Sequence, residues 1–212
     1  MTGSNHPTLS VVSRQATDHD LQSMLDTLVP AFVDDPVWGD WAFPDRSRAT
    51  GQRRAIFGLW LQGALRYRAI RVTQSCEAVA AWFAPEGTAS SESELLDLVA
   101  SARALLGSHA EVFLKGCQLL EAAHPQSRPH YYLSLLGTHG DHRGKGLGMG
   151  LLRENLTMLD AAGIPAYLES TNPKNLPRYE RLGFRRIDAL DLPGAGPRVD
   201  LMWREPSSAC SF

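Results

Sequence analysis

The sequence has few cysteines, no excess of positive or negative charge, and no long hydrophobic run. Its three cysteines, Cys76, Cys117 and Cys210, are odd in number and widely spaced. This spacing fits neither a disulfide framework nor a zinc site, so we expect no metal and a reducing cytoplasm. The formal net charge of −2 argues against a nucleic-acid-binding protein, which normally carries a basic excess. No run reaches the ~18 apolar residues of a membrane span, and we expect the polar N-terminus not to be a signal peptide.

The remaining composition is typical of a globular protein. Hydrophobic residues make up 43% of the 212 residues and charged residues 21%. This length suits one compact domain. We predict that domain over residues 9–205, between a flexible N-terminus at 1–8 and a flexible tail at 206–212.

Hydrophobic spacing predicts an α/β (α+β) chain. We expect strands over 9–14, 69–73, 79–83, 131–136, 166–170, 184–187 and 197–203. We expect helices over 17–33, 45–68, 91–124 (divided near residue 107), 146–162 and within 171–183. The strand–helix–strand unit over 131–170 implies a parallel, right-handed crossover. Together these elements predict a mixed central sheet of about six to seven strands with helices on both faces.

A glycine-rich segment, Arg143 to Gly148 (RGKGLG), stands between the strand over 131–136 and the helix that follows. The first backbone N–H groups of a helix have no partner inside it, and the helix dipole places partial positive charge there. Glycines let this backbone approach a diphosphate closely, and Arg143 and Lys145 add positive charge. The segment therefore predicts a binding site for a phosphorylated ligand.

Two common phosphate-binding motifs do not fit this segment. A Walker A loop requires Ser or Thr after its lysine, but Gly146 follows Lys145. Counted from Gly144, a Rossmann fingerprint requires a third glycine where Met149 stands. The segment instead resembles the acyl-CoA signature of the GNAT N-acetyltransferases, Gln/Arg-x-x-Gly-x-Gly/Ala.

A second segment, Glu169 to Phe184, resembles the second GNAT motif, Asn-x-x-Asn/Ala-x-x-x-Tyr-x-x-x-Gly-Phe. Its Asn175 and Tyr179 are four residues apart, so a helix places them on one face. The resemblance implies that Asn175 hydrogen-bonds the pantetheine arm of acetyl-CoA. It also implies that Tyr179, with an ordinary phenol pKa near 10, is the general acid that protonates the leaving thiolate.

The similarity is greater still to the puromycin N-acetyltransferases. It rests on Asp141 to Gly148, Pro165 to Glu169 and Asn175 to Phe184, with a looser likeness over 31–46. It is weak through the helical middle of the chain, which helps to form the acceptor site in such enzymes. It implies a GNAT fold and transfer of an acetyl group from acetyl-CoA to a primary amine of a small molecule. An aminonucleoside antibiotic is one such acceptor, and antibiotic resistance one such role.

The resemblance also implies which residues hold the cofactor. Backbone groups of the strand end and of the glycine-rich segment would contact the pantetheine amides and the diphosphate, respectively. With the Asn175 side chain, the predicted cofactor-binding residues are Leu136, Gly137, Thr138, Arg143, Gly144, Lys145, Gly146, Leu147, Gly148 and Asn175.

The general base has two candidates. Glu169 ends the strand over 166–170 and can act through a water molecule, whereas His139 titrates near neutral pH. An acceptor with an α-amino pKa near 8 needs little help, because part of it is already neutral at pH 7. We assign Glu169 as the base and keep His139 as the alternative.

The acceptor site is predicted near residues 34–46. Asp34 and Asp35 would attract a cationic acceptor, or they form a solvated turn. Trp38, with Trp41 and Phe43, forms either an apolar wall for the substrate or a small satellite core. We predict Asp34, Asp35 and Trp38 as substrate-binding residues.

Two other functions fit the same motifs. One is acetylation of protein N-termini or lysines, and the other is a non-catalytic, CoA-binding regulatory GNAT module. Tyr179 favours an enzyme, because binding alone does not require a proton donor. The chain alone is compatible with a monomer or a homodimer.

Overall fold

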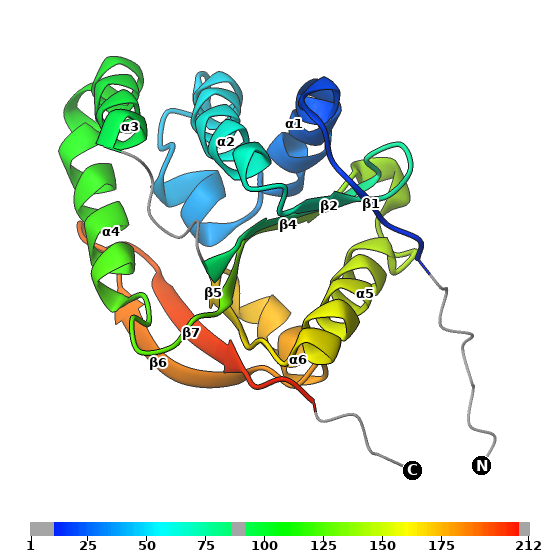
Figure 1. Ribbon diagram of the computed structural model, residues 1–212. Helices are drawn as coiled ribbons and strands as arrows, with labels where there is room; N and C mark the ends of the chain where they lie inside the picture. The colour runs from blue at the N-terminus through cyan, green and yellow to red at the C-terminus, as the bar shows by residue number, and fades with distance from the viewer. Residues whose placement is uncertain (1–10, 86–91, 208–212) are drawn as a thin grey trace, which may run out of the picture.

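The computed structural model describes residues 11–85 and 92–207, and Figure 1 shows its arrangement. Seven strands form one sheet in the order β1-β2-β3-β4-β5-β7-β6. They are β1 (Arg14–Gln15), β2 (Ile70–Val72), β3 (Ala78–Phe83), β4 (Tyr131–Thr138), β5 (Ala166–Ser170), β6 (Arg185–Asp191) and β7 (Arg198–Arg204). Among these strands β4 and β5 pair in parallel, and the other neighbours pair antiparallel. The predicted mixed sheet and parallel crossover are confirmed.

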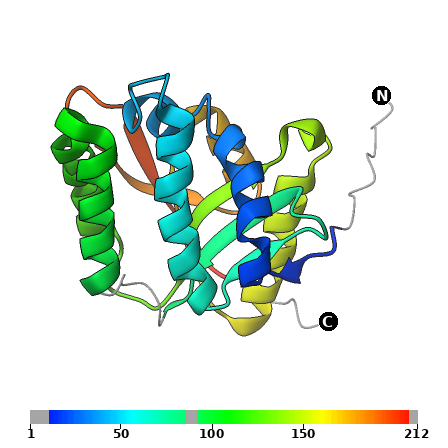
Figure 2. The same cartoon turned by 90° about the horizontal axis from the view of Figure 1, so that it is seen from above.

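Six helices cover the two faces of this sheet. They are α1 (Leu21–Ala31), α2 (Ala49–Arg66), α3 (Glu92–Leu106), α4 (Ala110–Ala123), α5 (Leu147–Ala162) and α6 (Leu176–Glu180). Helices α1, α2 and α3 lie side by side over one face (Figures 1 and 2), and α5 and α6 lie on the other. The predicted break near residue 107 is a short helical turn, Gly107–His109, between α3 and α4.

Each face of the sheet carries its own hydrophobic core. The core beneath α1 to α4 is the larger and includes Leu28, Phe57 and Phe113, all fully buried. The core beneath α5 includes Leu151 and Phe184. The sheet is therefore covered on both sides, as expected of a sheet with a parallel crossover.

The predicted first strand, residues 9–14, is wrong in its position. Within the described residues the strand is Arg14–Gln15, and residues 9–10 lie outside them. Just before it, the Ser13 backbone N–H donates to Glu154 Oε1 on α5 (3.2 Å). The first residue of the helix predicted over 91–124, Ser91, also lies outside the described residues.

The segment expected to be a loop after α1 contains a helical turn, Pro36–Trp41. Asp35 caps it, because its Oδ1 accepts hydrogen bonds from the backbone N–H groups of Val37 and Trp38, both at 3.0 Å. The turn is local and short, so the three-and-four spacing that identifies longer helices does not reveal it.

A buried arginine holds this turn against α2. Arg53 is 2% exposed, and its Nε donates to the Trp38 carbonyl at 2.8 Å. Its Nη1 and Nη2 donate to the carbonyls of Val29 (3.3 Å) and Gly39 (3.4 Å). The guanidinium lies over the Phe43 ring, 5.6 Å from its centroid. Burial lowers the pKa of Arg53, but the three carbonyls accept hydrogen bonds from the guanidinium and so stabilise its charged form.

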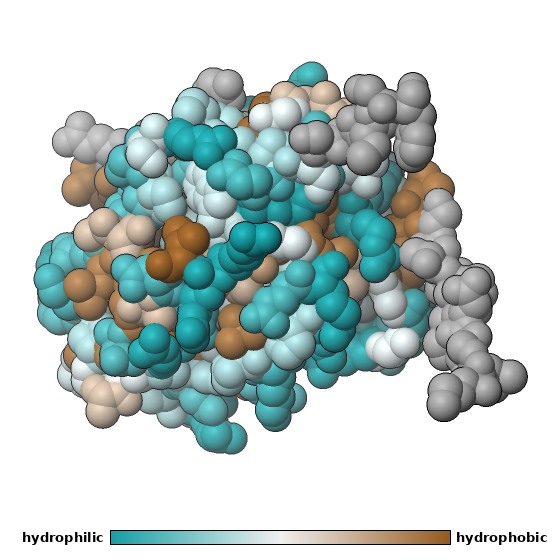
Figure 3. Space-filling model, turned by 90° about the horizontal axis from the view of Figure 1, so that it is seen from below, coloured by the Kyte–Doolittle hydropathy of each residue, from teal (hydrophilic) through white to brown (hydrophobic). Residues whose placement is uncertain are grey.

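The face seen from below is mainly hydrophilic, with hydrophobic residues scattered among charged ones (Figure 3). Across the part of the chain that the structure describes, no helix combines the length and apolar character that crossing a bilayer demands.

Because Arg53 bonds three carbonyls of the chain around Trp38, its replacement should destabilise the protein. We expect Arg53→Met to lower the free energy of unfolding by about 2–4 kcal/mol, since buried carbonyls lose their donors. The neighbouring Arg54→Met is the control: Arg54 forms a surface ion pair with Asp26 (2.8 Å), and its loss should cost less than about 1 kcal/mol. Urea denaturation measures both, and equal losses would contradict this role of Arg53.

Candidate active site

Strands β4 and β5 part in the middle of the sheet. They pair only where Tyr131–Leu133 faces Ala166–Leu168. On its other edge, where it pairs with β3, β4 has a bulge. The adjacent residues Ala81 and Trp82 of β3 pair with Leu135 and Leu133 of β4, respectively. Ser134 is the extra residue of this bulge. Leu133 packs into the α5-side core, whereas Leu135, two residues on, packs into the core beneath α1 to α4. The bulge thus reverses the alternation of β4 where β4 leaves β5.

A cleft of about 410 Å³ lies where the two strands part. Its walls come from β4, β5, the segment after α1, and the segment around α6. The lining residues are Phe32, Asp35, Trp38, Leu133, Ser134, Leu136, Leu168, Glu169, Ser170, Thr171, Asn175 and Tyr179. The structure therefore brings together six residues of the predicted site: Asp35, Trp38, Leu136, Glu169, Asn175 and Tyr179.

The glycine-rich segment shapes the N-terminus of α5. Gly144 and Gly146 have φ of 78° and 76°, a region in which residues with a side chain are strained. Gly146 is the N-cap of α5, and no side chain caps the helix there. The first N–H groups of α5 are therefore available to an anion.

Two glycines allow close packing around the end of β4. A Cβ on Gly148 would lie 2.6 Å from Thr138 Oγ1, so the first turn of α5 packs directly on β4. A Cβ on Gly137 would lie 2.7 Å from Leu28 Cδ2, which brings α1 against the same strand. Thr138 thus joins the strand end to the helix N-terminus.

The two cations of the glycine-rich segment differ in their surroundings. The Arg143 Nη2 donates to the carbonyls of Pro30 (3.2 Å) and Ala31 (3.1 Å) at the C-terminus of α1. Lys145 is exposed. Arg143 therefore ties the segment to α1, and a contact of either cation with a ligand stays a prediction.

Glu169 accepts two tyrosine hydrogen bonds. The Tyr132 hydroxyl donates to its Oε2 (2.9 Å) and the Tyr167 hydroxyl to its Oε1 (3.2 Å). Burial raises the pKa of Glu169 to about 7; the two hydroxyls lower that pKa, and the carboxylate of Glu121 raises it. A carboxylate with a pKa near 7 is well suited to accept a proton at neutral pH.

Tyr179 is suited to the opposite role. It lies on α6, and its ring meets the Phe184 ring edge-on at 6.1 Å. Burial, followed by the charge of Asp35, raises its pKa to about 12, so the phenol keeps its proton at neutral pH. Asn175, one turn earlier, reaches the same cleft, and its Oδ1 accepts a hydrogen bond from Arg178 (3.1 Å).

The candidate base and acid belong to opposite sides of the sheet. Tyr132 and Tyr167, which bond Glu169, pack with the core beneath α1 to α4. Tyr179 packs against the core beneath α5. The gap between β4 and β5 is therefore the passage through which groups from both sides can meet.

The predicted acceptor residues are placed differently from one another. The Asp35 carboxylate caps the Pro36–Trp41 turn, and its Oδ2 accepts a hydrogen bond from Thr171 Oγ1 (2.8 Å), so it ties this turn to the end of β5. Burial raises its pKa. Asp34 is exposed and does not line the cleft. Their substrate-binding roles stay predictions, as does that of Trp38.

The other two aromatic residues of this segment belong to the core. Phe43 is fully buried, and the Trp41 ring stacks on Phe113 at 6.4 Å while its Nε1 donates to the Pro193 carbonyl (3.0 Å). All three aromatic residues, Trp38 included, thus pack in the main core beneath α1 to α4 and form no separate satellite core. The alternative base, His139, is not among the residues that line the cleft.

Sequence reasoning missed the two tyrosines that bond Glu169. Tyr167 stands two residues before Glu169 on the same strand, and side chains two apart share a face, so this partner could have been identified. Tyr132 reaches Glu169 only because β4 and β5 are parallel and in register at Tyr132 and Tyr167. That register is not visible in either segment alone.

Comparisons with known proteins agree on one family. The model of the acetyltransferase (GNAT) family matches residues 77–184, about half of the chain. A curated Schizosaccharomyces pombe protein, described as an uncharacterized N-acetyltransferase, is 32% identical over 80 residues. That match covers 37% of this chain and 32% of the relative, so the chain spans about a third of that relative's length.

Solved structures extend the similarity to nearly the whole fold. A Corynebacterium glutamicum structure, described as histone acetyltransferase HPA2 and related acetyltransferase, is 25% identical with a TM-score of 0.64, and the match covers 95% of this chain and 99% of that one. A Drosophila melanogaster polyamine N-acetyltransferase, described as forming N-acetylagmatine, is 14% identical with a TM-score of 0.56 and coverage of 92% and 99%. At 14% identity, the match to the Drosophila melanogaster protein shows similarity of fold alone.

The hydrogen bond from Tyr132 stabilises the charged form of Glu169, so its removal should raise the pKa of Glu169. We expect Tyr132→Phe to shift the titration of Glu169 from about pH 7 to higher pH, by roughly one pH unit. Carbon-13 NMR of labelled glutamate carboxyl groups measures this. Tyr131→Phe is the control, because Tyr131 packs on the other face against Trp82. An unchanged pKa in Tyr132→Phe would contradict the assigned hydrogen bond.

Proposed function

The chain belongs to the acetyltransferase (GNAT) family, and from this we propose that it transfers the acetyl group of acetyl-CoA to the primary amine of a small molecule, by direct attack in a ternary complex. The observation that carries this proposal is the cleft between β4 and β5, which has a carboxylate with a raised pKa at one wall and a protonated phenol at another. A proton acceptor and a proton donor are the two groups that aminolysis of a thioester needs.

The residues around the cleft fit acetyl-CoA. The uncapped α5 N-terminus offers backbone N–H groups to a diphosphate at Arg143 to Gly148, and Gly148 leaves no room for a side chain. Residues Leu136 to Thr138 lie beyond the paired part of β4, so they have no β5 partner. Their backbone groups would bond the pantetheine amides, with the Asn175 side chain beside them. Acetyl-CoA supplies an activated thioester carbonyl.

The protein's own groups would move two protons. Glu169 takes a proton from the acceptor ammonium, directly or through water, which leaves a nucleophilic amine. As the new N–C bond forms and the C–S bond breaks, Tyr179 gives its proton to the departing sulfur. The amide nitrogen loses its second proton to solvent, Tyr179 is reprotonated from solvent, and Glu169 returns its proton to solvent. The turnover therefore releases one net proton for each acceptor ammonium, and the charges balance. Positioning of the two reactants in one cleft contributes the rest of the rate.

Two observations support the acceptor class. The aromatic rings of Phe32 and Trp38 at the cleft favour a compact, partly apolar amine. A puromycin-like aminonucleoside, with a role in antibiotic resistance, rests on the motif resemblance over 141–148 and 175–184. A thiol-release assay with acetyl-CoA tests these acceptors in one panel of puromycin, aminoglycosides, simple amines and histone-like peptides. Turnover of peptides alone would replace the small-molecule proposal, and turnover of nothing despite CoA binding would indicate a regulatory module.

Tyr179→Phe tests the proton donor. We expect kcat to fall by about 100-fold, as for loss of a general acid, while the Kd for CoA stays within about twofold. A thiol-release assay measures kcat, and calorimetric titration with CoA measures the Kd. Retention of full kcat by this variant would show that another group protonates the sulfur.

Gly148→Ala tests the anion site. Its Cβ would meet Thr138 Oγ1 at 2.6 Å and push the first turn of α5 off β4, so we expect the affinity for CoA to fall by about tenfold or more. Gly51→Ala is the matched control, because nothing lies within 4 Å of a Cβ at that helical position. Calorimetric titration with CoA compares the two variants. Equal CoA affinities in the two variants would indicate that the diphosphate binds elsewhere on the protein.

A further inference from the structure

Ser134 is a polar residue at the point where β4 and β5 part. The parallel pairing ends with Leu133 opposite Leu168, so the next pair of the same register would be Ser134 and Glu169. Both residues line the cleft, and Ser134 is half-buried. The serine hydroxyl and the proposed base therefore lie at the first position of the gap, one on each strand.

Ser134 shares a face of the sheet with Tyr132 and Glu169. Side chains two residues apart on a strand point to the same face, as do those of residues paired across neighbouring strands. Tyr132 packs with the core beneath α1 to α4, and the bulge reverses the alternation of β4 only after Ser134. The Ser134 hydroxyl is therefore on the side of the sheet on which Tyr132 bonds Glu169.

A chain of hydroxyl groups leads from the cleft to Glu169. The Tyr132 hydroxyl donates to Glu169 Oε2 at 2.9 Å. Burial, followed by the charge of Glu169, raises the pKa of Tyr132 well above its ordinary value, and a side-chain hydrogen bond from Ser134 lowers that pKa. A hydrogen bond has this effect on a phenol when it is donated to the phenolic oxygen. With its proton directed at Tyr132, the Ser134 oxygen keeps lone pairs for an N–H group in the cleft.

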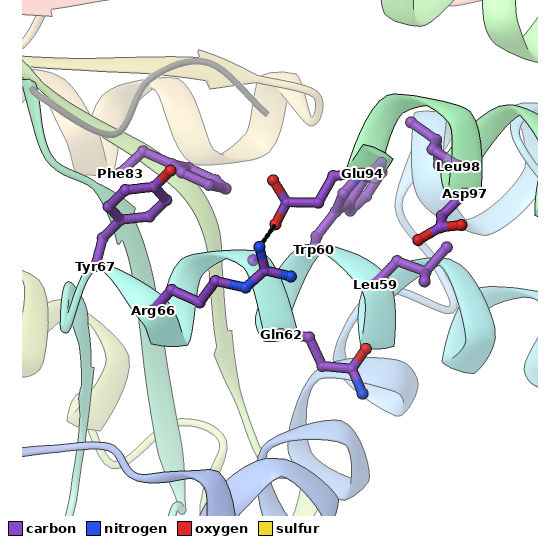
Figure 4. A pocket seen from close by; sticks show the side chains of 10 residues that line it. Leu59, Trp60, Gln62, Arg66, Tyr67, Phe83, Glu94, Asp97 and Leu98 are labelled. Carbon is purple, nitrogen blue, oxygen red and sulfur yellow. Dashed lines mark ion pairs between the residues drawn. The ribbon is translucent and has the colours of Figure 1, made fainter. Parts of the chain in front are cut away.

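Ring contacts hold the phenol of Tyr132 in place. Phe83 of β3 stacks on it with 6.0 Å between the ring centroids, and the Tyr167 ring lies 5.6 Å away. Phe83 in turn lines a separate pocket between α2 and α3, where it lies beside Tyr67 (Figure 4). A ring that is packed in this way keeps its hydroxyl between its two hydrogen-bond partners.

We propose that Ser134 is a further catalytic residue, whose hydroxyl contacts the acceptor ammonium and passes one proton through Tyr132 to Glu169. The inference rests on the proposed function, because it assigns the route by which Glu169 acts as the base. The ammonium proton moves to Ser134 Oγ, the Ser134 proton to Tyr132 Oη, and the Tyr132 proton to Glu169 Oε2. The electron pair of the broken N–H bond stays on nitrogen as the nucleophilic lone pair, and the carboxylate becomes a carboxylic acid.

The three proton transfers occur together. A buried phenolate beside the carboxylate of Glu169 would be costly, so Tyr132 gains one proton as it loses another. The same holds for Ser134, and neither hydroxyl carries a charge at any stage. After Glu169 has returned its proton to solvent, the two hydroxyls rotate back to donate toward it.

Ser134→Thr and Ser134→Val form the matched pair of variants for the test. Both side chains are β-branched and suit a strand, and they have nearly the same shape, but only Thr keeps the hydroxyl. The probe is 2-phenylethylamine, a compact and partly apolar alkylamine with a pKa near ~10, so it is mainly an ammonium ion at neutral pH. We expect kcat/KM for this probe to be about tenfold or more lower in Ser134→Val than in Ser134→Thr.

A second probe separates proton transfer from a structural effect. In 2,2-difluoro-2-phenylethylamine the fluorines withdraw electrons and lower the basicity of the amine, so much more of it is already neutral and needs no base. The two variants should differ by less than about twofold with this probe. Thermal unfolding and the affinity for CoA should be equal in both. If Ser134→Val does not fold, Ser134→Ala replaces it in the same comparison.

A double variant tests whether Ser134 and Tyr132 act as one relay. Residues that act as a unit have non-additive effects, because the first substitution already breaks the chain. We expect Tyr132→Phe combined with Ser134→Val to have a kcat/KM for 2-phenylethylamine within about twofold of the lower of the two single variants. Losses that multiply would show that the two hydroxyls act separately and would overturn the relay.

The outcomes distinguish the relay from the proposed function. Equal kcat/KM of Ser134→Thr and Ser134→Val with 2-phenylethylamine, or an equal loss with both probes, overturns the relay and leaves the proposed function in place. A wild type that acetylates neither probe overturns the relay together with the acceptor class from which the probes were chosen, and the panel of acceptors then decides the proposed function by itself. A loss in Ser134→Val that is confined to the basic amine supports the relay.

Discussion

The parting of β4 from β5 is the constraint on which the rest of the site depends. Parallel neighbours ordinarily continue to exchange backbone hydrogen bonds, yet here they pair for three residues and then separate. The bulge at Ser134 turns β4 away, which leaves backbone groups beyond it without the partner that a sheet supplies. Such groups cost about 1–3 kcal/mol each when buried and unpaired. A ligand with amides of its own can satisfy them, so the interruption of the sheet favours a bound chain molecule.

The same parting explains how the proposed acid, Tyr179, and the proposed base, Glu169, come to line one cleft. Side chains alternate along β5, so Tyr167 and Glu169 point to the face beneath α1 to α4, while Leu168 points to the other. Tyr179 comes from α6 on that other side. In a continuous sheet the backbone layer would separate Glu169 from Tyr179. With the strands apart, the two groups line one cleft, and their pKa values, about 7 and about 12, differ enough for opposite roles.

Local patterns predicted more of this structure than long-range contacts did. The glycine-rich turn, α5 and the parallel crossover follow from residues close together in the chain, and the structure confirms them. Tyr132 and Arg53 were not predicted as part of the site. Tyr132 meets Glu169 across 37 positions, and Arg53 holds the Trp38 carbonyl from a different helix. Neither has a local spacing that signals its partner, because the sheet register and the helix packing bring them together. The misplaced first strand has the same origin, since a two-residue pairing depends on β2.

The part of the chain with the weakest motifs is the helical excursion formed by α3 and α4. Helices α3 and α4 enter between β3 and β4, two strands that are themselves paired, so this helical excursion does not alter the sheet. It can therefore vary without disturbing the glycine turn, whereas Glu121 of α4 acts on the pKa of Glu169. Its Glu94 fits into space left by Gly63 of α2, and Trp60 of α2 meets the ring of Trp38, which lines the cleft, edge-on. Under the proposed function, a helical excursion that varies apart from the glycine turn lets the choice of acceptor change while the site for the thioester is kept.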